Sequence, residues 1–282
     1  MFAQLLNGIA LGSLYMVLSS GLAMIYGLRG VTNFAHGALY MAGAYIAFSV
    51  SANVSFWAAL IIAPICLGLL GATLELLFFR RLQHRNHIEV GLVTFGLAMI
   101  LERLIVLIWG KQTYAVEAPA ALSGSVSLLG TDYPAYRVFV IGVALALALA
   151  LVIWIRFTKT GLYIRAASHS VETASVLGIN VDRVSLVVVC VGAALAGLAG
   201  ALAAPYVSVN PVMGGTILII VLIVVVIGGA GSIGGAMVAG MGLGILQTVG
   251  AAWLPSVAVL VPYAALVAVL LWRPTGLAGK RA

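Results

Sequence analysis

Long apolar runs occupy most of this sequence, separated by short clusters of charged residues or of glycine and proline. A helix needs about 20 apolar residues to cross a bilayer. The runs fall at 2–27, 33–52, 55–79, 88–109, 136–157, 184–205, 215–228, 235–251 and 255–272. The sequence therefore predicts an all-α polytopic membrane protein, a bundle of about eight or nine transmembrane helices forming a single domain over residues 1–282.

Composition supports this prediction and excludes other classes. Only 7% of the residues are charged and 63% are hydrophobic, whereas soluble domains carry about 25% charged residues. So few charged side chains cannot cover a soluble fold of this size, which excludes a cytosolic enzyme, a secreted domain and a disordered chain. The net charge of +7 is spread between apolar runs and forms no aromatic-rich basic patch. We expect membrane lipid around the chain and no nucleic-acid partner.

The distribution of lysine and arginine predicts the orientation, because cytoplasmic connections carry an excess of these residues. Eleven basic residues fall on one side: Arg29, Arg80, Arg81, Arg85, Arg156, Lys159, Arg165, Arg183, Arg273, Lys280 and Arg281. Lys111 and Arg137 fall on the other side. We therefore expect loops 80–87 and 158–183 and the C-terminus in the cytoplasm. Nine crossings would place the N-terminus outside, but the glycine-broken stretch 228–235 could form a re-entrant element and change the count.

Two connections between spans are long enough to bind partners. The external loop 110–135 is either a landing surface for an extracytoplasmic protein or an irregular connector. In the cytoplasmic segment 158–183, Ser170 can cap a short helix that has Glu172 in its first turn, and Gly178 can end it in a left-handed conformation. This helix either inserts into a groove on another protein or rests on the lipid headgroups.

The same segment resembles a known family. Glu172-Thr173-Ala174, followed by Gly178, resembles the Glu-Ala-Ala…Gly loop of bacterial ABC-importer permeases, and the string from Arg165 to Arg183 is similar to the branched-chain amino-acid (Liv-type) branch. The resemblance implies that this loop docks on an ATPase subunit. The docking residues would be Arg165, Glu172, Ala174 and Gly178.

Further matches extend the resemblance to the H-type permease subunit over residues 7–277. They are Asn7–Tyr15, Ile25–Gly27, Asn33–Gly37, Met41–Tyr45, Gly228–Ala236 and Arg273–Leu277. The resemblance implies a second homologous permease subunit, two cytoplasmic ATP-binding subunits that hold ATP and magnesium, an extracytoplasmic solute-binding protein and a bacterial cytoplasmic membrane. It implies no cofactor and no catalysed reaction in this chain. Many members have Glu after the His-Gly pair, where this chain has Ala38.

Two glycine motifs resemble nucleotide-binding motifs but lack other residues that such motifs need. Gly229-x-Gly231-x-x-Gly234 matches a dinucleotide fingerprint, which needs an acidic residue about 20 positions later. The sequence has no Asp or Glu after Asp182. These glycines therefore indicate either a helix break that lines the transport pathway or close helix packing. The tail around Lys280 has Arg281 where a phosphate loop needs Ser or Thr.

Ionisable residues inside membrane spans are costly and are candidate pathway residues. Glu75 lies near the end of its span, and we expect it to reach toward Arg80 or Arg81. Glu102 and its neighbour Arg103 point about 100° apart on a helix, so each is expected to meet a partner on another helix or subunit.

Asn33 and His36 begin a span and have either a gating or a structural role, with Asn33 as a possible helix cap. None of the four histidines has a partner at metal-ligand spacing, so we expect no metal.

The apolar, almost uncharged interior suits a net neutral solute. We expect a branched-chain or other hydrophobic amino acid, or a related small solute such as an amide or urea. The alternative is a stand-alone channel or an ion-coupled secondary carrier, but carriers of that kind usually have several intramembrane carboxylates.

Overall fold

The computed structural model describes residues 2–82, 85–128, 130–253 and 255–279. The long helices are α1 (Phe2–Arg29), α2 (His36–Asn53), α3 (Phe56–Leu74), α4 (His87–Trp109), α5 (Ala135–Phe157), α8 (Val181–Ala203), α9 (Met213–Gly228), α10 (Ile233–Trp253) and α11 (Val261–Trp272). The shorter elements are η1 (Glu75–Phe79), η2 (Ala120–Leu122), β1 (Ser125–Leu128), β2 (Thr131–Pro134), α6 (Lys159–His169), α7 (Val171–Val176) and η3 (Pro255–Leu260). The predicted basic residues Lys280 and Arg281 lie outside the described residues.

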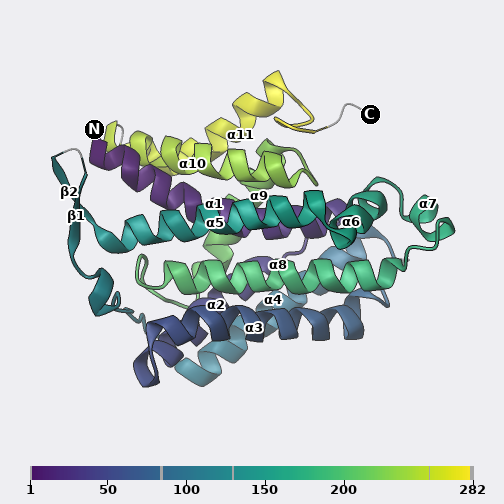
Figure 1. The fold of residues 1–282 in the computed structure, drawn as a ribbon, viewed down its shortest axis with the longest axis horizontal. Coiled ribbons are helices and arrows are strands. Elements are labelled where there is room, and N and C mark those ends of the chain that lie inside the picture. Colours follow the sequence, from purple (N-terminus) through teal and green to yellow (C-terminus); the bar gives the residue numbers. More distant parts are fainter. Residues whose placement is uncertain (1, 83–84, 129, 254, 280–282) are drawn as a thin grey trace.

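The helices confirm the all-α polytopic prediction. Within the described residues, seven helical segments are long and apolar enough to cross a membrane. Two more helices, α2 with 18 residues and α9 with 16, are not among these seven but belong to the same bundle (Figure 1). We call the end that carries Arg29 and α7 the basic end, and the opposite end, which carries the β1–β2 hairpin, the loop end.

Glycine lets the central helices approach closely. A Cβ at Gly12 of α1 would lie 2.7 Å from the carbonyl oxygen of Met241 of α10, and one at Gly8 would lie 2.7 Å from the Cα of Ile245. No side chain fits between backbones at this separation, as in small-residue packing of membrane helices. The glycines at four-residue spacing, Gly8 and Gly12 on α1 and Gly240 and Gly244 on α10, therefore form the contact surface between these helices.

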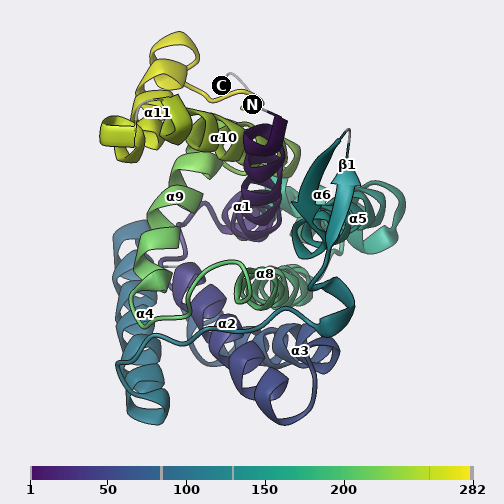
Figure 2. The ribbon, with the colours of Figure 1, turned by 90° about the vertical axis from the view of Figure 1, so that its left-hand side faces the viewer.

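The bundle consists of two halves of inverted topology, α1–α4 and α8–α11. Helices α9 and α10 each begin 177 positions after α2 and α3 (36 to 213, 56 to 233). Viewed along the bundle, α1 and α8 lie at the centre, α10 and α3 flank them on opposite sides, and α11 and α4 occupy corresponding corners (Figure 2). The segment α5–α7 connects the two halves and has no counterpart in either.

Reciprocal contacts mark the axis that relates the halves. A Cβ at Gly21 of α1 would lie 2.9 Å from the oxygen of Gly192 of α8, and a Cβ at Gly192 would lie 3.1 Å from the oxygen of Gly21. Gly37 of α2 and Gly214 of α9 face each other in the same mutual way. Such self-complementary contacts are typical of a two-fold axis. Because α1 and α8 run antiparallel, the axis is perpendicular to the bundle, as in inverted-repeat transporters.

Two non-helical segments enter the bundle, one from each end. Residues 30–35 run inward from the basic end, and α2 then begins near the middle of α1, where His36 Nε2 lies 3.0 Å from the oxygen of Leu18. Residues 204–212 run inward from the loop end to the start of α9. The sequence suggested a re-entrant element at 228–235, but that stretch is a turn between α9 and α10.

The loop-end connection is partly ordered by pairing. Strands β1 and β2 form an antiparallel hairpin, which the sequence did not predict. Tyr114 pairs through its backbone with Val209, which lies in the other inward segment. The ring of Tyr114 also packs on Phe48, with 4.4 Å between centroids. Part of the external loop is thus fixed to the bundle rather than irregular.

The basic end contains a buried ion pair that contradicts one expectation. Glu75, with only 2% of its side chain exposed, pairs with Arg29 of α1 and not with Arg80 or Arg81. Arg29 also donates to the oxygen of Phe79 at 3.0 Å. The expected reach of Glu75 toward its own helix end is wrong, because the side chain of Arg29 at the end of α1 pairs with this buried carboxylate.

Candidate translocation site

A cavity of about 860 Å³ opens toward the loop end. Its size lies within the range of ligand sites in proteins, about 300–1,000 Å³. Both halves of the bundle contribute to its wall. The lining residues are Tyr15, Tyr40, Glu102, Val207, Ser208, Asn210, Val212, Met213, Gly215, Thr216, Ile217, Ile219, Ile220, Gln247, Val259, Pro262 and Tyr263.

A few polar side chains lie among the mainly apolar residues of the cavity wall. The Tyr15 hydroxyl donates to Gln247 Oε1 at 2.9 Å, which links α1 to α10 across the cavity. Glu102 projects from α4 and makes no salt bridge with any residue in the described part of the chain. Of the predicted pathway residues, Glu102 is the one that lines this cavity.

The cavity lies beside two helices, α4 and α11, that bury few of their residues. Pro262 is the buried residue of α11, and α4 buries five residues on one face. A carboxylate that faced hydrocarbon at this position would be strongly disfavoured. The α4–α11 face near Glu102 therefore needs a protein or aqueous surface over it.

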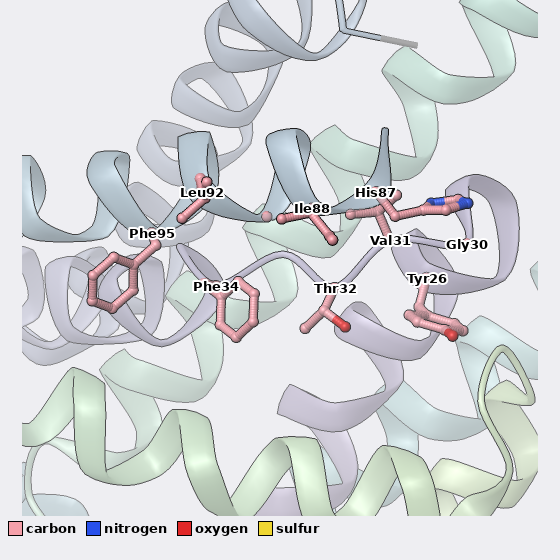
Figure 3. A pocket seen from close by; sticks show the side chains of 10 residues that line it. Tyr26, Gly30, Val31, Thr32, Phe34, His87, Ile88, Leu92 and Phe95 are labelled. Carbon is pink, nitrogen blue, oxygen red and sulfur yellow. The ribbon is translucent and has the colours of Figure 1, made fainter. Parts of the chain in front are cut away.

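A second hollow, the basic-end groove, has a volume of about 480 Å³ and lies between residues 30–34 and α4 (Figure 3). His87, Tyr26 and Thr32 lie toward one part of it, and Phe34 and Phe95 toward the other. The repeat relates the groove to the loop-end cavity. Residues 30–34 correspond to 207–211, and the first turn of α4 corresponds to that of α11 (87 to 261). Each half thus forms an opening at its own end.

Asn33 and His36 lie at the break before α2 and do not line the loop-end cavity. Asn33 Oδ1 accepts a hydrogen bond from the Ala35 amide at 3.0 Å, so it stabilises the turn, and Ala35 occupies the N-cap position. His36 is fully buried against α1. These contacts stabilise the start of α2.

The glycines of the 229–234 motif are not part of the cavity wall either. Gly229 has φ +96° and Gly231 has φ +82°, values that favour glycine. A Cβ at Gly231 would lie 3.0 Å from the Cα of Gly27, whereas Gly234 is exposed and has nothing within 4 Å of its Cβ position. A helix break is present here, but it forms a packed turn at the basic end.

The predicted docking residues fall into two groups. Glu172 is exposed on α7, and Gly178 has φ +81° at the end of that helix. Ser170 Oγ accepts from the Thr173 amide at 3.1 Å, which confirms the predicted cap. Ala174, in contrast, is buried against the rest of the chain.

Arg165 lies on α6, a helix that the sequence analysis did not predict. Its guanidinium donates to the backbone oxygen of Ile155 at the end of α5. The exposed apolar residues at the tip are Val176 and Leu177, 86% and 73% exposed.

Sequence reasoning missed Tyr15, Tyr40 and Gln247 in the cavity wall. Tyrosine and glutamine carry no charge, and tyrosine is common at membrane interfaces. No sequence signal therefore set them apart from residues that merely pack. The described residues contain no group of three or more His, Cys, Asp or Glu placed to hold a metal ion.

The fold and the cavity are those of a membrane permease, and comparison with known proteins gives the family. Residues 4–270 match the model of the family described as "Branched-chain amino acid transport system / permease component". The chain belongs to this family.

Curated relatives match over almost the whole length. The "High-affinity branched-chain amino acid transport system permease protein LivH" of Salmonella typhimurium is 32% identical, covering 98% of this chain and 95% of the relative. The protein of the same name from Escherichia coli K12 is also 32% identical with the same coverage. The corresponding protein BraD of Pseudomonas aeruginosa is 30% identical, again over 98% and 95%.

Proposed function

We propose that this chain is a transmembrane subunit of an ATP-driven ABC importer for branched-chain or other hydrophobic amino acids, or for a related small neutral solute such as an amide or urea. The family match over residues 4–270 carries this proposal. The mainly apolar cavity at the loop end supports a small solute with an aliphatic part. No bond is made or broken in this chain.

In this proposal the chain lies in the bacterial cytoplasmic membrane, with the basic end and the C-terminus in the cytoplasm. The excess of Lys and Arg at that end supports the orientation. The hairpin end then faces an extracytoplasmic solute-binding protein, which delivers the solute to the loop-end cavity.

Two cytoplasmic ATPase subunits bind ATP and magnesium, and one of them docks on α7. The exposed Val176 and Leu177 project from the basic end and are suited to an apolar groove on that subunit. Glu172 lies on the same exposed helix. Arg165 and Ala174 are the other two docking residues: Arg165 is exposed on α6, and Ala174 is buried on α7, where it positions that helix.

A second homologous permease covers the α4–α11 face. Glu102, which makes no salt bridge within the described residues, lies beside this face and supports a protein cover rather than lipid. The two permeases then enclose the solute path between them. ATP-driven movement of α7 closes the loop-end cavity and opens the basic-end groove, as expected for alternating access between repeat-related openings.

The experiment is co-purification of the assembled transporter after Leu177→Glu, which places a charge on the exposed tip. We expect loss of the ATPase and of uptake, with normal insertion of the permease. Val126→Glu is the control for ATPase retention alone, because Val126 is an exposed apolar residue at the opposite end, in the hairpin that faces the solute-binding protein. Retention of the ATPase and full uptake in Leu177→Glu would reject docking at α7.

The alternative remains a stand-alone channel or an ion-coupled secondary carrier. Purification of the wild-type chain from its own host in mild detergent separates these functions. Recovery of two ATPases with a second permease supports the importer. A homo-oligomer that transports solute without any ATPase would favour the alternative.

A further inference from the structure

Glu102 is the charged residue in the described lining of the loop-end cavity, which contains no lysine, arginine or histidine. The salt bridges among the described residues engage the carboxylates of Glu75, Asp182 and Glu89, and not that of Glu102. A carboxylate in a membrane-spanning helix needs a compensating cation. That cation therefore comes from outside the described part of the chain.

The rest of the wall offers two other kinds of chemistry. Hydroxyl and amide donors that can bind a carboxylate are Tyr40, Ser208, Asn210, Thr216 and Gln247. Apolar side chains line the stretch around the start of α9, among them Met213 and Ile217. A single ligand that satisfies the whole wall has an ammonium group, a carboxylate and an aliphatic side chain.

We propose that Glu102 binds the α-ammonium group of a zwitterionic aliphatic amino acid during its passage through the loop-end cavity. This inference rests on the proposed transport function and selects amino acids from the solutes named there. An amide or urea has no cationic group and would leave Glu102 unpaired. A hard metal cation takes six or more oxygen ligands, usually with several carboxylates, and Glu102 is the sole carboxylate in the described wall.

The test measures binding of radiolabelled leucine to the full complex of permeases and ATPases in nanodiscs. The solute-binding protein is left out, so that it contributes no binding. Glu102→Gln keeps the size of the side chain and removes its charge. Glu89→Gln is the matched control, because Glu89 is an exposed carboxylate on the same helix, 3.8 Å from Arg85.

We expect Glu102→Gln to raise the dissociation constant for leucine about tenfold or more, the loss of one charge-assisted hydrogen bond, and Glu89→Gln to leave it unchanged. The wild-type complex should also prefer leucine over 4-methylpentanoate, which has the same skeleton without the ammonium group. Glu102→Gln should reduce this preference by a similar factor, an effect that general unfolding would not produce.

Each contrary result has a distinct meaning. Wild-type affinity in Glu102→Gln overturns the ammonium site and leaves the transport function intact. Loss of the second permease from the Glu102→Gln complex assigns the carboxylate to a basic residue of that subunit and also overturns the site. A wild-type complex that hydrolyses ATP but binds urea or acetamide and no amino acid contradicts both the site and the amino-acid substrate.

Discussion

Arg29, the last residue of α1, donates to the carboxylate of Glu75, which lies 46 positions later at the start of η1. Arg29 Nη2 also donates to Ser185 Oγ of α8 at 2.7 Å. One guanidinium therefore joins α1, η1 and α8 at the basic end. The ring of Phe79 lies 5.6 Å from the guanidinium carbon. Because Glu75 is buried, its charge depends on this single arginine.

Replacing Arg29 by methionine should therefore destabilise the protein strongly. The buried carboxylate of Glu75 would lose its cation, a change that costs about 3–5 kcal/mol. Thermal unfolding in detergent, followed by tryptophan fluorescence, measures the effect as a lower Tm.

The matched control for this substitution is Arg80→Met. Arg80 pairs with Asp182 at 2.6 Å, but both side chains are substantially exposed, 53% and 35%. Exposed pairs contribute about 0–1 kcal/mol, so its Tm should change little. Equal Tm values for the two variants would contradict the structural importance of the Arg29–Glu75 pair.

Gly12→Leu should disrupt the packing of α1 on α10. A Cβ at this position would already lie 2.7 Å from the Met241 oxygen, and the remaining leucine atoms need still more room. We expect a loss of about 1–3 kcal/mol or more, because backbone must move. Gly142→Leu on α5 is the control, since a Cβ there has nothing within 4 Å. We compare the Tm and the amount of inserted protein for the two variants. Wild-type values for Gly12→Leu would contradict the close approach of α1 and α10.

Gly178→Ala should loosen the end of α7. Gly178 has φ +81°, and an L-residue in this region costs roughly 1–2 kcal/mol. Hydrogen exchange of the amides around 174–179 should become about 5–30 times faster, as expected for a loss of that size. Gly124→Ala, at a glycine without positive φ, should leave exchange at the hairpin unchanged. Unaltered exchange in Gly178→Ala would show that the helix end does not depend on this conformation.

Tyr114→Ala should release the external connection from the bundle. The Tyr114 ring packs on Phe48 and on Tyr45, with 4.4 and 6.2 Å between centroids. Limited proteolysis from the loop end should cut residues 110–134 faster in this variant. Tyr163→Ala, at an exposed tyrosine on α6, serves as the control. Cleavage at the wild-type rate would indicate that backbone pairing with Val209 alone holds the loop.

The positions of the helices were predictable from the sequence, because the apolar runs are long and several end at a charge or a glycine. The predicted run 255–272 coincides with η3 and α11, and 88–109 differs from α4 by one residue. The caps at Ser170 and Gly178 were predictable for a similar reason, since both depend on neighbouring residues only.

Contacts between distant segments were not predictable in this way. The nearest basic residues in sequence suggested Arg80 or Arg81 as the partner of Glu75, whereas the three-dimensional neighbour is Arg29. The inverted repeat was equally hidden, because its halves share helix spacing and glycine contacts rather than an evident sequence motif. Tyr15 and Gln247 are brought together only when α1 packs along α10.

The pairing of α1–α4 with α8–α11 has a consequence for the direction of transport. Two halves related by an axis in the plane of the membrane present equivalent helices to both membrane faces. The repeated helices alone therefore favour neither direction of transport. Polarity must arise from elements without a counterpart, namely the hairpin loop at one end and α6–α7 at the other. The difference between the two ends of the bundle, on which any direction of transport depends, thus lies in the chain between the halves.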